Sequence, residues 1–346
     1  MAKSPSVGEM LLRMLAARGV DALFANSGTD FPSVIEAYAS EDAAALPRPV
    51  LCPHETVAVG MADGYARVSG RAQAVMVHVN VGAANALAGL FNAASEFVPM
   101  LFMAGRTPIL EAGAPGARSL NIHWAQEMFD QGGMLREAVK WDYELRRPEQ
   151  LPVVVDRALA IAHSDPTGPV ALTLPREVLA EPFETAPAPP ALRPLSPTAP
   201  DAAAVETLAA MLTEAERPMI VTASAGRDVS VPPLLAAFAE RFGVRVVSFR
   251  PRFHTLGTEH PLHGGFEVEP WLAEADAILV LECDVPWMPG GRTPRADARV
   301  VQAGPDPLFA RYPVRGFRGE AFLPVRAAPL LGALSAAMPS RPAHYA

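Results

Sequence analysis

The sequence predicts an α/β fold, a doubly wound parallel sheet followed by a smaller Rossmann-like domain. Before residue 184, helical segments alternate with short apolar strands, as in parallel sheets that are covered on both faces. Residues 184–200 are rich in proline and lack periodicity, which predicts a semi-rigid linker. After residue 200 the alternation resumes. The expected domains are therefore residues 1–183 and 201–335, with residues 336–346 as a C-terminal tail.

The elements of the first domain follow from apolar runs and the residues that interrupt them. An amphipathic helix follows residues 1–6, and residues 20–29 predict a helix end, a strand and a turn. Residues 50–52 end a short strand that Pro53 breaks, and apolar side chains then recur at helical spacing as far as Tyr65. A buried strand is expected further along, at residues 74–79, leading into a helix start rich in small residues.

The second domain shows the same alternation in a shorter chain. Between its strands we expect a helix at residues 232–242. The expected strands are residues 219–222, 244–248, 277–281 and 299–302.

Composition excludes several classes of function. The formal net charge of −8 argues against nucleic-acid binding through a basic face. No apolar run is long enough to span a bilayer, and the chain does not begin with a signal-peptide pattern, so we expect a cytoplasmic protein. The two cysteines, Cys52 and Cys283, lie in separate apolar contexts and are expected to be buried, reduced thiols without metal-ligand spacing.

The segment from Cys52 to Arg67 is the most informative part of the chain. It places one carboxylate, Glu55, at the start of a helix made mostly of small and apolar residues. Small residues at every second position from Ala58 to Gly64 allow another backbone to approach closely. A carboxyl group desolvated at such a packed position has a raised pKa and can share a proton near neutrality. The alternative is an ordinary glutamate in the first turn of a helix, where the helix dipole favours it.

This segment resembles the glutamate helix of thiamine diphosphate (ThDP) enzymes of the acetolactate synthase and benzoylformate decarboxylase type. The resemblance implies that Glu55 hydrogen-bonds the cofactor's aminopyrimidine and favours its imino tautomer, which activates the thiazolium carbon. It also implies that the two expected domains are the family's pyrimidine-binding domain and its central domain.

The turn after the first strand is similar to the family's Gly-Asn-Pro-Gly-Ser turn. Ala25 replaces the first glycine and Ser27 replaces the proline, whereas Gly28 is retained and lets the backbone approach a ligand closely. By this resemblance Asn26, Ser27 and Gly28 bind the cofactor. Thr29 takes the position of a substrate-facing serine. A generic connection between a strand and a helix is the alternative.

A second part of the resemblance follows the strand at residues 74–79. His78 aligns with the family's active-site histidine, at the strand end where open α/β sheets place chemistry. Its ordinary pKa suits transfer of a proton to or from an intermediate. The small-residue segment that follows implies cofactor contacts from Val81, Gly82 and Asn85. The alternative for His78 is a core histidine that bonds backbone.

A third block comprises the segment from His123 to Glu127 and the segment from Val139 to Glu144. These are similar to the family's Phe-Gln-Glu and Lys-Trp-Ser-Tyr-Glu motifs. His123 and Gln126 are expected either to line a substrate or cofactor entrance or to form a polar contact between subunits. The aromatic residues of the second segment are expected to belong to the core.

The family's Mg²⁺ and diphosphate site lacks a counterpart in this chain. Its signature, Gly-Asp-Gly followed at a distance by Asn-Asn, is absent, and the sequence contains no Gly-Asp dipeptide. The resemblance implies that Mg²⁺ and the diphosphate are held by a missing domain or by a separate partner chain, and that the protein forms a homo- or hetero-oligomer. The turn after the strand at residues 219–222 lacks a glycine-rich phosphate loop, so FAD is not expected.

The expected function is that of a ThDP-dependent enzyme or its pyrimidine-binding subunit. It would act on a 2-oxo acid or a 2-hydroxyacyl substrate as a decarboxylase, or as a lyase or transferase that forms or cleaves a carbon–carbon bond. Glu55 and His78 are the expected catalytic residues, and Thr29, His78, His123 and Gln126 the expected substrate contacts. The alternative is a non-catalytic assembly or regulatory subunit, or a truncated fragment, that retains the fold.

Overall fold

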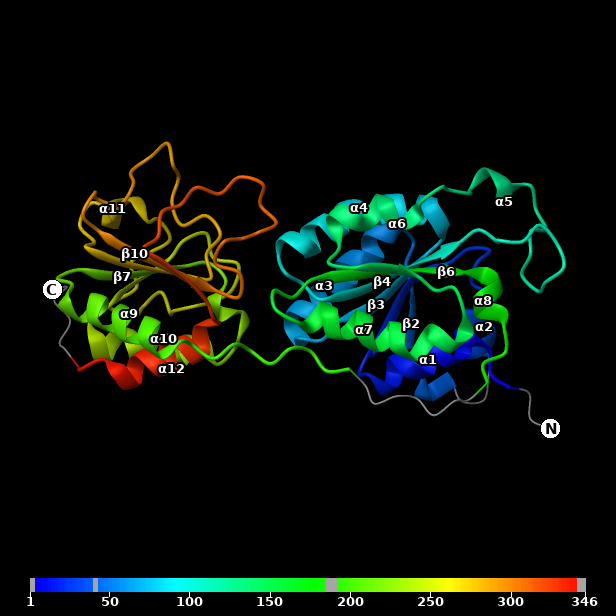
Figure 1. Cartoon of the computed structure of the whole chain (residues 1–346), viewed down its shortest axis with the longest axis horizontal. Coiled ribbons are helices and arrows are strands. Elements are labelled where there is room, and N and C mark those ends of the chain that lie inside the picture. The colour runs from blue at the N-terminus through cyan, green and yellow to red at the C-terminus, as the bar shows by residue number, and fades with distance from the viewer. Residues whose placement is uncertain (1–3, 40–42, 185–191, 341–346) are drawn as a thin grey trace. The chain divides into compact units, whose positions relative to one another are not determined.

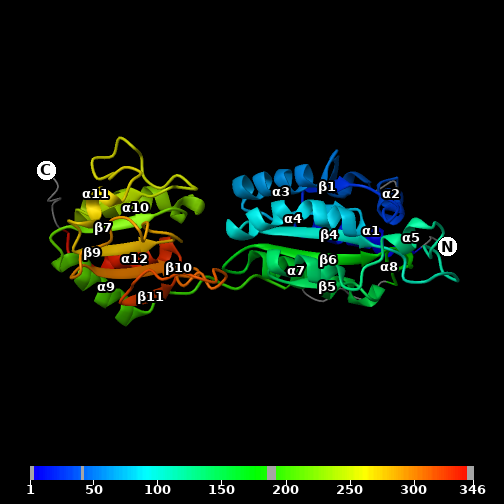
Figure 2. The same cartoon turned by 90° about the horizontal axis from the view of Figure 1, so that it is seen from above.

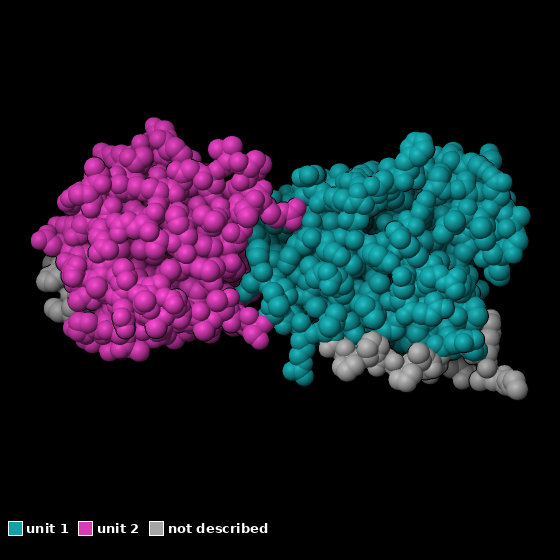
Figure 3. Space-filling model, viewed as in Figure 1, with its two compact units in different colours: residues 1–195 teal, residues 196–346 magenta. Residues whose placement is uncertain are grey.

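A computed structural model describes residues 4–39, 43–184 and 192–340. The chain divides into two compact units, residues 1–195 and 196–346 (Figures 1 and 3). Parts of the predicted linker and tail lie outside the described residues. Within those residues no helix is long and apolar enough to cross a membrane.

The first unit is built around a six-stranded sheet in the order β2-β1-β3-β4-β6-β5, and every neighbouring pair is parallel. Its elements are α1 (Val7–Ala17), β1 (Ala22–Asn26), α2 (Pro32–Tyr38), β2 (Arg48–Leu51), α3 (Glu55–Ser69), β3 (Gln73–Val77), α4 (Val79–Ser95), β4 (Met100–Arg106), α5 (Ile122–Ala125), α6 (Gln131–Leu135), β5 (Asp142–Glu144), α7 (Leu151–His163), β6 (Pro169–Pro175) and α8 (Arg176–Ala180). The prediction of a doubly wound parallel sheet is confirmed.

Helices cover both faces of this sheet, as Figure 2 shows for α3 and α4 against α7. The core under α3 and α4 contains Phe24 and Val75, and the core under α1 and α7 contains Leu23 and Met76. Neighbouring residues of one strand thus enter opposite cores, which explains why these strands read as continuous apolar runs.

Local sequence signals set the ends of α3. Pro53 ends the preceding segment, and the Nδ1 atom of His54 accepts the backbone N–H of Thr56 at 3.1 Å, which caps the helix start. The helix ends at Gly70, whose φ of 71° suits glycine. Glu55 therefore occupies the first helical position, as expected.

The predicted boundary after the strand at residues 74–79 is wrong, whereas other predicted ends differ by one or two residues. The strand expected at residues 74–79 spans Gln73–Val77, and His78 is the N-cap residue of α4, which begins at Val79. The apolar run continues through Val79, so composition alone does not separate the strand from the helix that follows it. His78 still lies at the carboxyl end of β3.

The second unit holds a five-stranded parallel sheet in the order β11-β10-β9-β7-β8. Its elements are α9 (Ala202–Glu214), β7 (Pro218–Thr222), α10 (Val231–Phe242), β8 (Arg245–Ser248), α11 (Glu269–Leu272), β9 (Ala277–Leu281), β10 (Arg299–Gly304), β11 (Ala321–Pro324) and α12 (Ala327–Ala337). Helices α9, α10 and α12 share one core, and α11 packs in a second core (Figure 1). The smaller Rossmann-like domain is confirmed, with β11 as an additional, half-exposed edge strand.

Polar side chains of the second unit bond one another beyond the carboxyl ends of β8 and β9. The two terminal guanidinium nitrogens of Arg252 donate to the Asp284 carboxylate, at 3.0 and 2.7 Å, and the Tyr312 hydroxyl donates to it at 2.9 Å. Burial alone would raise the pKa of Asp284, but the bonds from Arg252 and Tyr312 hold that pKa below its ordinary value. Cys283 beside it is buried, as is Cys52, and both are free thiols as predicted.

Candidate active site

The candidate site lies at the point in the first sheet where the order of strand addition reverses, between β1 and β3. Strand β1 pairs with β2 on one side and with β3 on the other, so the turns after β1 and β3 leave the sheet next to each other. Open α/β sheets bind ligands at such a switch point, beyond the carboxyl ends of the strands. The Nδ2 atom of Asn26 donates to the backbone oxygen of Cys52 at 2.9 Å, which ties the end of β1 to the entry of α3.

Glu55 faces α4. Its side chain is buried, and its Oε2 accepts the Nδ2 atom of Asn85 at 3.1 Å. The Thr56 hydroxyl also donates to the backbone oxygen of Asn85, at 3.3 Å. The absence of a side chain at Gly82 leaves space beside Glu55, because a Cβ there would lie 3.4 Å from Oε1 and 3.0 Å from Val77. The structure thus brings together three of the predicted cofactor residues.

His78 is held between the turn after β1 and the loop that carries Gln126. Its Nδ1 lies 2.6 Å from Oδ1 of Asp30, and its Nε2 lies 3.3 Å from Nε2 of Gln126. The imidazole packs directly on Gly28, where a Cβ would lie only 2.2 Å from Nδ1. Gly28 is therefore required for the close approach of the ring, while Asp30 is a partner that sequence reasoning missed.

The surroundings of His78 favour its protonated form. The hydrogen bond to Asp30 raises the pKa of His78 above its ordinary value, burial opposes this, and the charges of Asp30 and Glu55 add to the increase. A histidine with a raised pKa holds its proton at a higher pH and returns it to a sufficiently basic partner.

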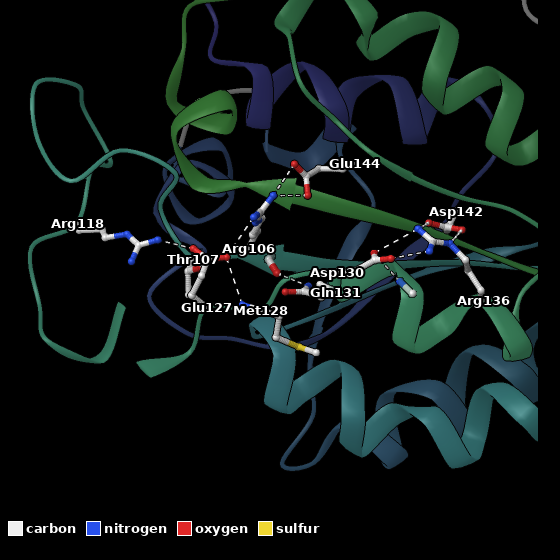
Figure 4. Close-up of polar contacts among 12 residues, drawn as sticks. Arg106, Thr107, Arg118, Glu127, Met128, Asp130, Gln131, Arg136, Asp142 and Glu144 are labelled. Carbon is white, nitrogen blue, oxygen red and sulfur yellow. Dashed lines mark hydrogen bonds and ion pairs between the residues drawn. The ribbon is translucent and has the colours of Figure 1, made fainter. Parts of the chain in front are cut away.

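Gln126 is positioned by its neighbour Glu127, which ties the long loop between β4 and α6 to the sheet (Figure 4). Glu127 accepts Arg106 at 3.1 Å and the Thr107 hydroxyl at 3.0 Å, and it also pairs with Arg118. Burial alone would raise the pKa of Glu127, but the bonds from Thr107 and Arg106 hold it below its ordinary value. The loop therefore carries an ionised carboxylate at its attachment point.

Arg106 joins the two motifs of the third sequence block. Besides Glu127 it bonds both carboxylate oxygens of Glu144, at 2.7 and 2.6 Å, as Figure 4 shows. The glutamates that end the two motifs thus share one guanidinium, although 17 positions separate them in the chain (144 − 127). Trp141 and Tyr143 stack with centroids 5.9 Å apart and pack against the core, as predicted.

Within residues 43–184, His123 makes no direct hydrogen bond to His78 or to Gln126. It is buried in α5, and its Nδ1 accepts the backbone N–H of Ser119 at 3.1 Å. Burial lowers the pKa of His123, and the nearby charges of Arg176 and Arg118 lower it further. His123 is therefore neutral at pH 7 and stabilises its own loop.

The remaining predicted contacts lie at the exposed side of the site. Ser27, Thr29 and Val81 are exposed to solvent. Ser27 and Thr29 lie in the turn after β1, just before the buried Asp30, and Val81 lies in the first turn of α4.

Helices α3 and α4 differ sharply between their two faces. Ala58 and Ala62 are fully buried, and Gly89 lets α4 approach α3, because a Cβ there would lie 2.7 Å from Val59. Gly60 faces outward, and a Cβ there would meet nothing within 4 Å. Large apolar side chains remain exposed on this outer face, namely Val57, Met61 and Val68 of α3 and Val81 and Phe91 of α4.

Comparisons with known proteins agree with this geometry. Residues 5–134 match the family model of the thiamine pyrophosphate enzyme, N-terminal TPP binding domain. The protein named probable 2-ketoarginine decarboxylase AruI, from Pseudomonas aeruginosa, is 30% identical over 286 residues, which cover 81% of this chain and 49% of that protein. The acetolactate synthase large subunit of Lactococcus lactis is 27% identical over 289 residues, covering 81% of this chain and 48% of that subunit.

Solved structures share the fold over almost the whole chain. A Mycobacterium smegmatis protein described as a thiamin diphosphate-dependent enzyme superposes with a TM-score of 0.81 and 26% identity, over 97% of this chain and 63% of its own. Benzoylformate decarboxylase from Polynucleobacter necessarius gives a TM-score of 0.79 at 24% identity, which supports the fold alone. This chain spans about half the length of the curated relatives it matches. By these matches the chain is a relative of the thiamine diphosphate-dependent enzymes, and residues 5–134 correspond to their N-terminal TPP binding domain.

Proposed function

We propose that this chain supplies the pyrimidine side of a ThDP site that acts on a 2-oxo acid or a 2-hydroxyacyl substrate, by decarboxylation or by making or breaking a carbon–carbon bond. The observation that carries the proposal is the buried carboxylate of Glu55, bonded to Asn85 at the start of α3 and close enough to His78 to influence its pKa.

The residues present fit an aminopyrimidine. Oε1 of Glu55 lies beside Gly82, where a Cβ would lie 3.4 Å away, so no side chain of that residue covers this oxygen. At the end of β1, Asn26 bonds the backbone before α3 and Gly28 packs against His78. When bound, ThDP supplies a carbon nucleophile and an acceptor for the electrons released from the substrate. Glu55 would hold and exchange a proton at the ring nitrogen.

His78 and Gln126 form the substrate side of the proposal. The imidazole can donate a proton when charged and accept one at Nε2 when neutral, and Gln126 supplies an amide next to that nitrogen. Thr29 lies at the exposed end of the same turn, where its hydroxyl can contact a substrate carboxylate or hydroxyl. The names of the relatives, a 2-ketoarginine decarboxylase and an acetolactate synthase, agree with a 2-oxo acid substrate.

The diphosphate and Mg²⁺ half of the site is proposed to come from elsewhere. The sequence carries no Gly-Asp-Gly motif, so we assign those ligands to a further domain or a partner chain. We also propose that the chain self-associates through the exposed apolar faces of α3 and α4. No flavin is assigned to the second unit, because its turn after β7 has no glycine-rich phosphate loop.

The experiment is hydrogen–deuterium exchange at C2 of ThDP, followed by NMR, with this chain assembled with a diphosphate-binding chain. Glu55→Gln keeps the shape and the bond to Asn85 but cannot exchange the proton, so the rate should fall on the order of 10²–10⁴-fold. Glu36→Gln, an exposed glutamate of α2, is the matched control and should leave the rate unchanged. Unchanged exchange in Glu55→Gln would refute the role of Glu55. Absence of accelerated exchange with the wild-type chain would favour a non-catalytic assembly subunit.

A further inference from the structure

Asp30 is a buried carboxylate whose contacts join two parts of the candidate site. Its side chain is 2% exposed, and it lies in the turn between β1 and α2. Its Oδ1 is 2.6 Å from Nδ1 of His78, and its Oδ2 accepts a longer bond, at 3.4 Å, from the backbone N–H of Val79. One carboxylate thus bonds both the histidine and the first helical residue of α4.

The surrounding backbone is shaped to accept this pair. In β4, a Cβ at Gly105 would lie 1.6 Å from Oδ2 of Asp30, so any side chain there would displace the carboxylate. On the other side, a Cβ at Gly28 would overlap the imidazole of His78. The carboxylate and the ring fit only because glycine occupies both positions.

The contacts select one tautomer of neutral His78. An ionised carboxylate can only accept, so the proton of the neutral ring resides on Nδ1 and is donated to Asp30. The lone pair is then on Nε2, where the amide nitrogen of Gln126 lies 3.3 Å away and can donate to it. Asp30 therefore selects the Nδ1–H tautomer, and the Gln126 amide, with its nitrogen toward the ring, fits the same arrangement.

We propose that Asp30 is a positioning residue that fixes His78 in the Nδ1–H tautomer and stabilises its imidazolium, so that Nε2 is the atom that accepts and returns a proton. The proposal rests on the proposed function for the reaction that uses this proton. A buried carboxylate behind a histidine plays this part in several unrelated hydrolases.

The charged groups around His78 include two that stabilise its imidazolium and one that would destabilise it. Asp30 from the turn after β1 and Glu55 from α3 stabilise the imidazolium, whereas His123 from α5 would oppose it if it were charged. Because His123 is held neutral by its burial, the two carboxylates dominate. Removing Asp30 should therefore lower the pKa of His78.

The test is NMR of the full chain with ¹⁵N-labelled histidine, which reports the tautomer and the pKa of each ring. We expect Nδ1–H for His78 in the wild type. Asp30→Asn has one acceptor where the wild type has two. If the new amide oxygen still accepts the N–H of Val79, the amide NH₂ group faces Nδ1 of His78. That NH₂ group can only donate, so Nδ1 must accept and the ring proton moves to Nε2. The variant should therefore lose the Nδ1–H signature and titrate at a lower pH.

Asp156→Asn is the matched control, since Asp156 is equally buried but pairs with Arg18. It should leave the titration of His78 unchanged. A wild-type His78 in the Nε2–H tautomer would overturn the proposal without any variant, even if Asp30→Asn failed to fold. So would a folded Asp30→Asn with unaltered tautomer and pKa. The measurement needs no cofactor, so its outcome is independent of the C2-exchange test of the proposed function.

Discussion

A charge placed on the outer face of α3 should separate the associated chains without harming the fold of one chain. In Gly60→Arg the new side chain meets no neighbouring atom of its own chain, because a Cβ at Gly60 has nothing within 4 Å. Replacing a helical glycine should even stabilise the helix, by roughly 0.5–1 kcal/mol. Any loss of association therefore reports on the interface.

The magnitude follows from desolvation. An unpaired buried charge costs several kcal/mol, and we take about 3 kcal/mol for one site. Each 1.4 kcal/mol changes a dissociation constant about tenfold, so one site weakens association roughly 100-fold. A two-fold symmetric dimer carries the substitution twice, which gives a combined weakening on the order of 10⁴-fold.

Analytical ultracentrifugation across micromolar concentrations measures this effect. Wild type should sediment as a dimer or a larger assembly, and Gly60→Arg as a monomer with the same circular dichroism spectrum. Gly332→Arg, at an exposed helical glycine of α12 with equally open space, is the control and should leave the assembly intact. A wild-type monomer would refute self-association, and an unchanged Gly60→Arg assembly would place the contact elsewhere.

Three further predictions concern the cofactor and the stability of the first unit. Isothermal calorimetry with ThDP and Mg²⁺ should detect little binding to this chain alone, and micromolar affinity would show that the diphosphate is held here. Glu127→Gln should reduce stability by about 1–3 kcal/mol at pH 7 because it loses charged bonds to Arg106. The pKa of Glu127 is lowered on folding, so wild type loses this contribution as the pH falls through that lowered pKa. Urea unfolding should therefore show the difference shrinking in acid, and a constant difference would contradict it. Gly89→Ala forces a Cβ to within 2.7 Å of Val59, costing about 1–3 kcal/mol against a gain of roughly 1 in helix propensity. A higher melting temperature than wild type would be inconsistent with this packing.

The alternation of helices and apolar strands, and the helix that carries Glu55, could be predicted from the sequence alone. Continuous apolar runs such as Ala74–Val77 are buried on both sides of a parallel sheet, and Pro53 and Gly70 mark the boundaries of α3 through backbone geometry. These signals are local, so a single chain without relatives reveals them. Local signals did not locate the end of the strand before His78, because the strand and the helix that follows it both contain apolar residues.

Which side chains contact one another became known only from the three-dimensional structure. Nothing local pairs Asp30 with His78, 48 positions away, or brings Glu127 and Glu144 to one arginine. Strand order brings such partners together, since β1 lies beside β3, and β4 and β5 lie on either side of β6. The strength of each pairing then depends on burial, because a carboxylate removed from water interacts strongly with the donors that reach it.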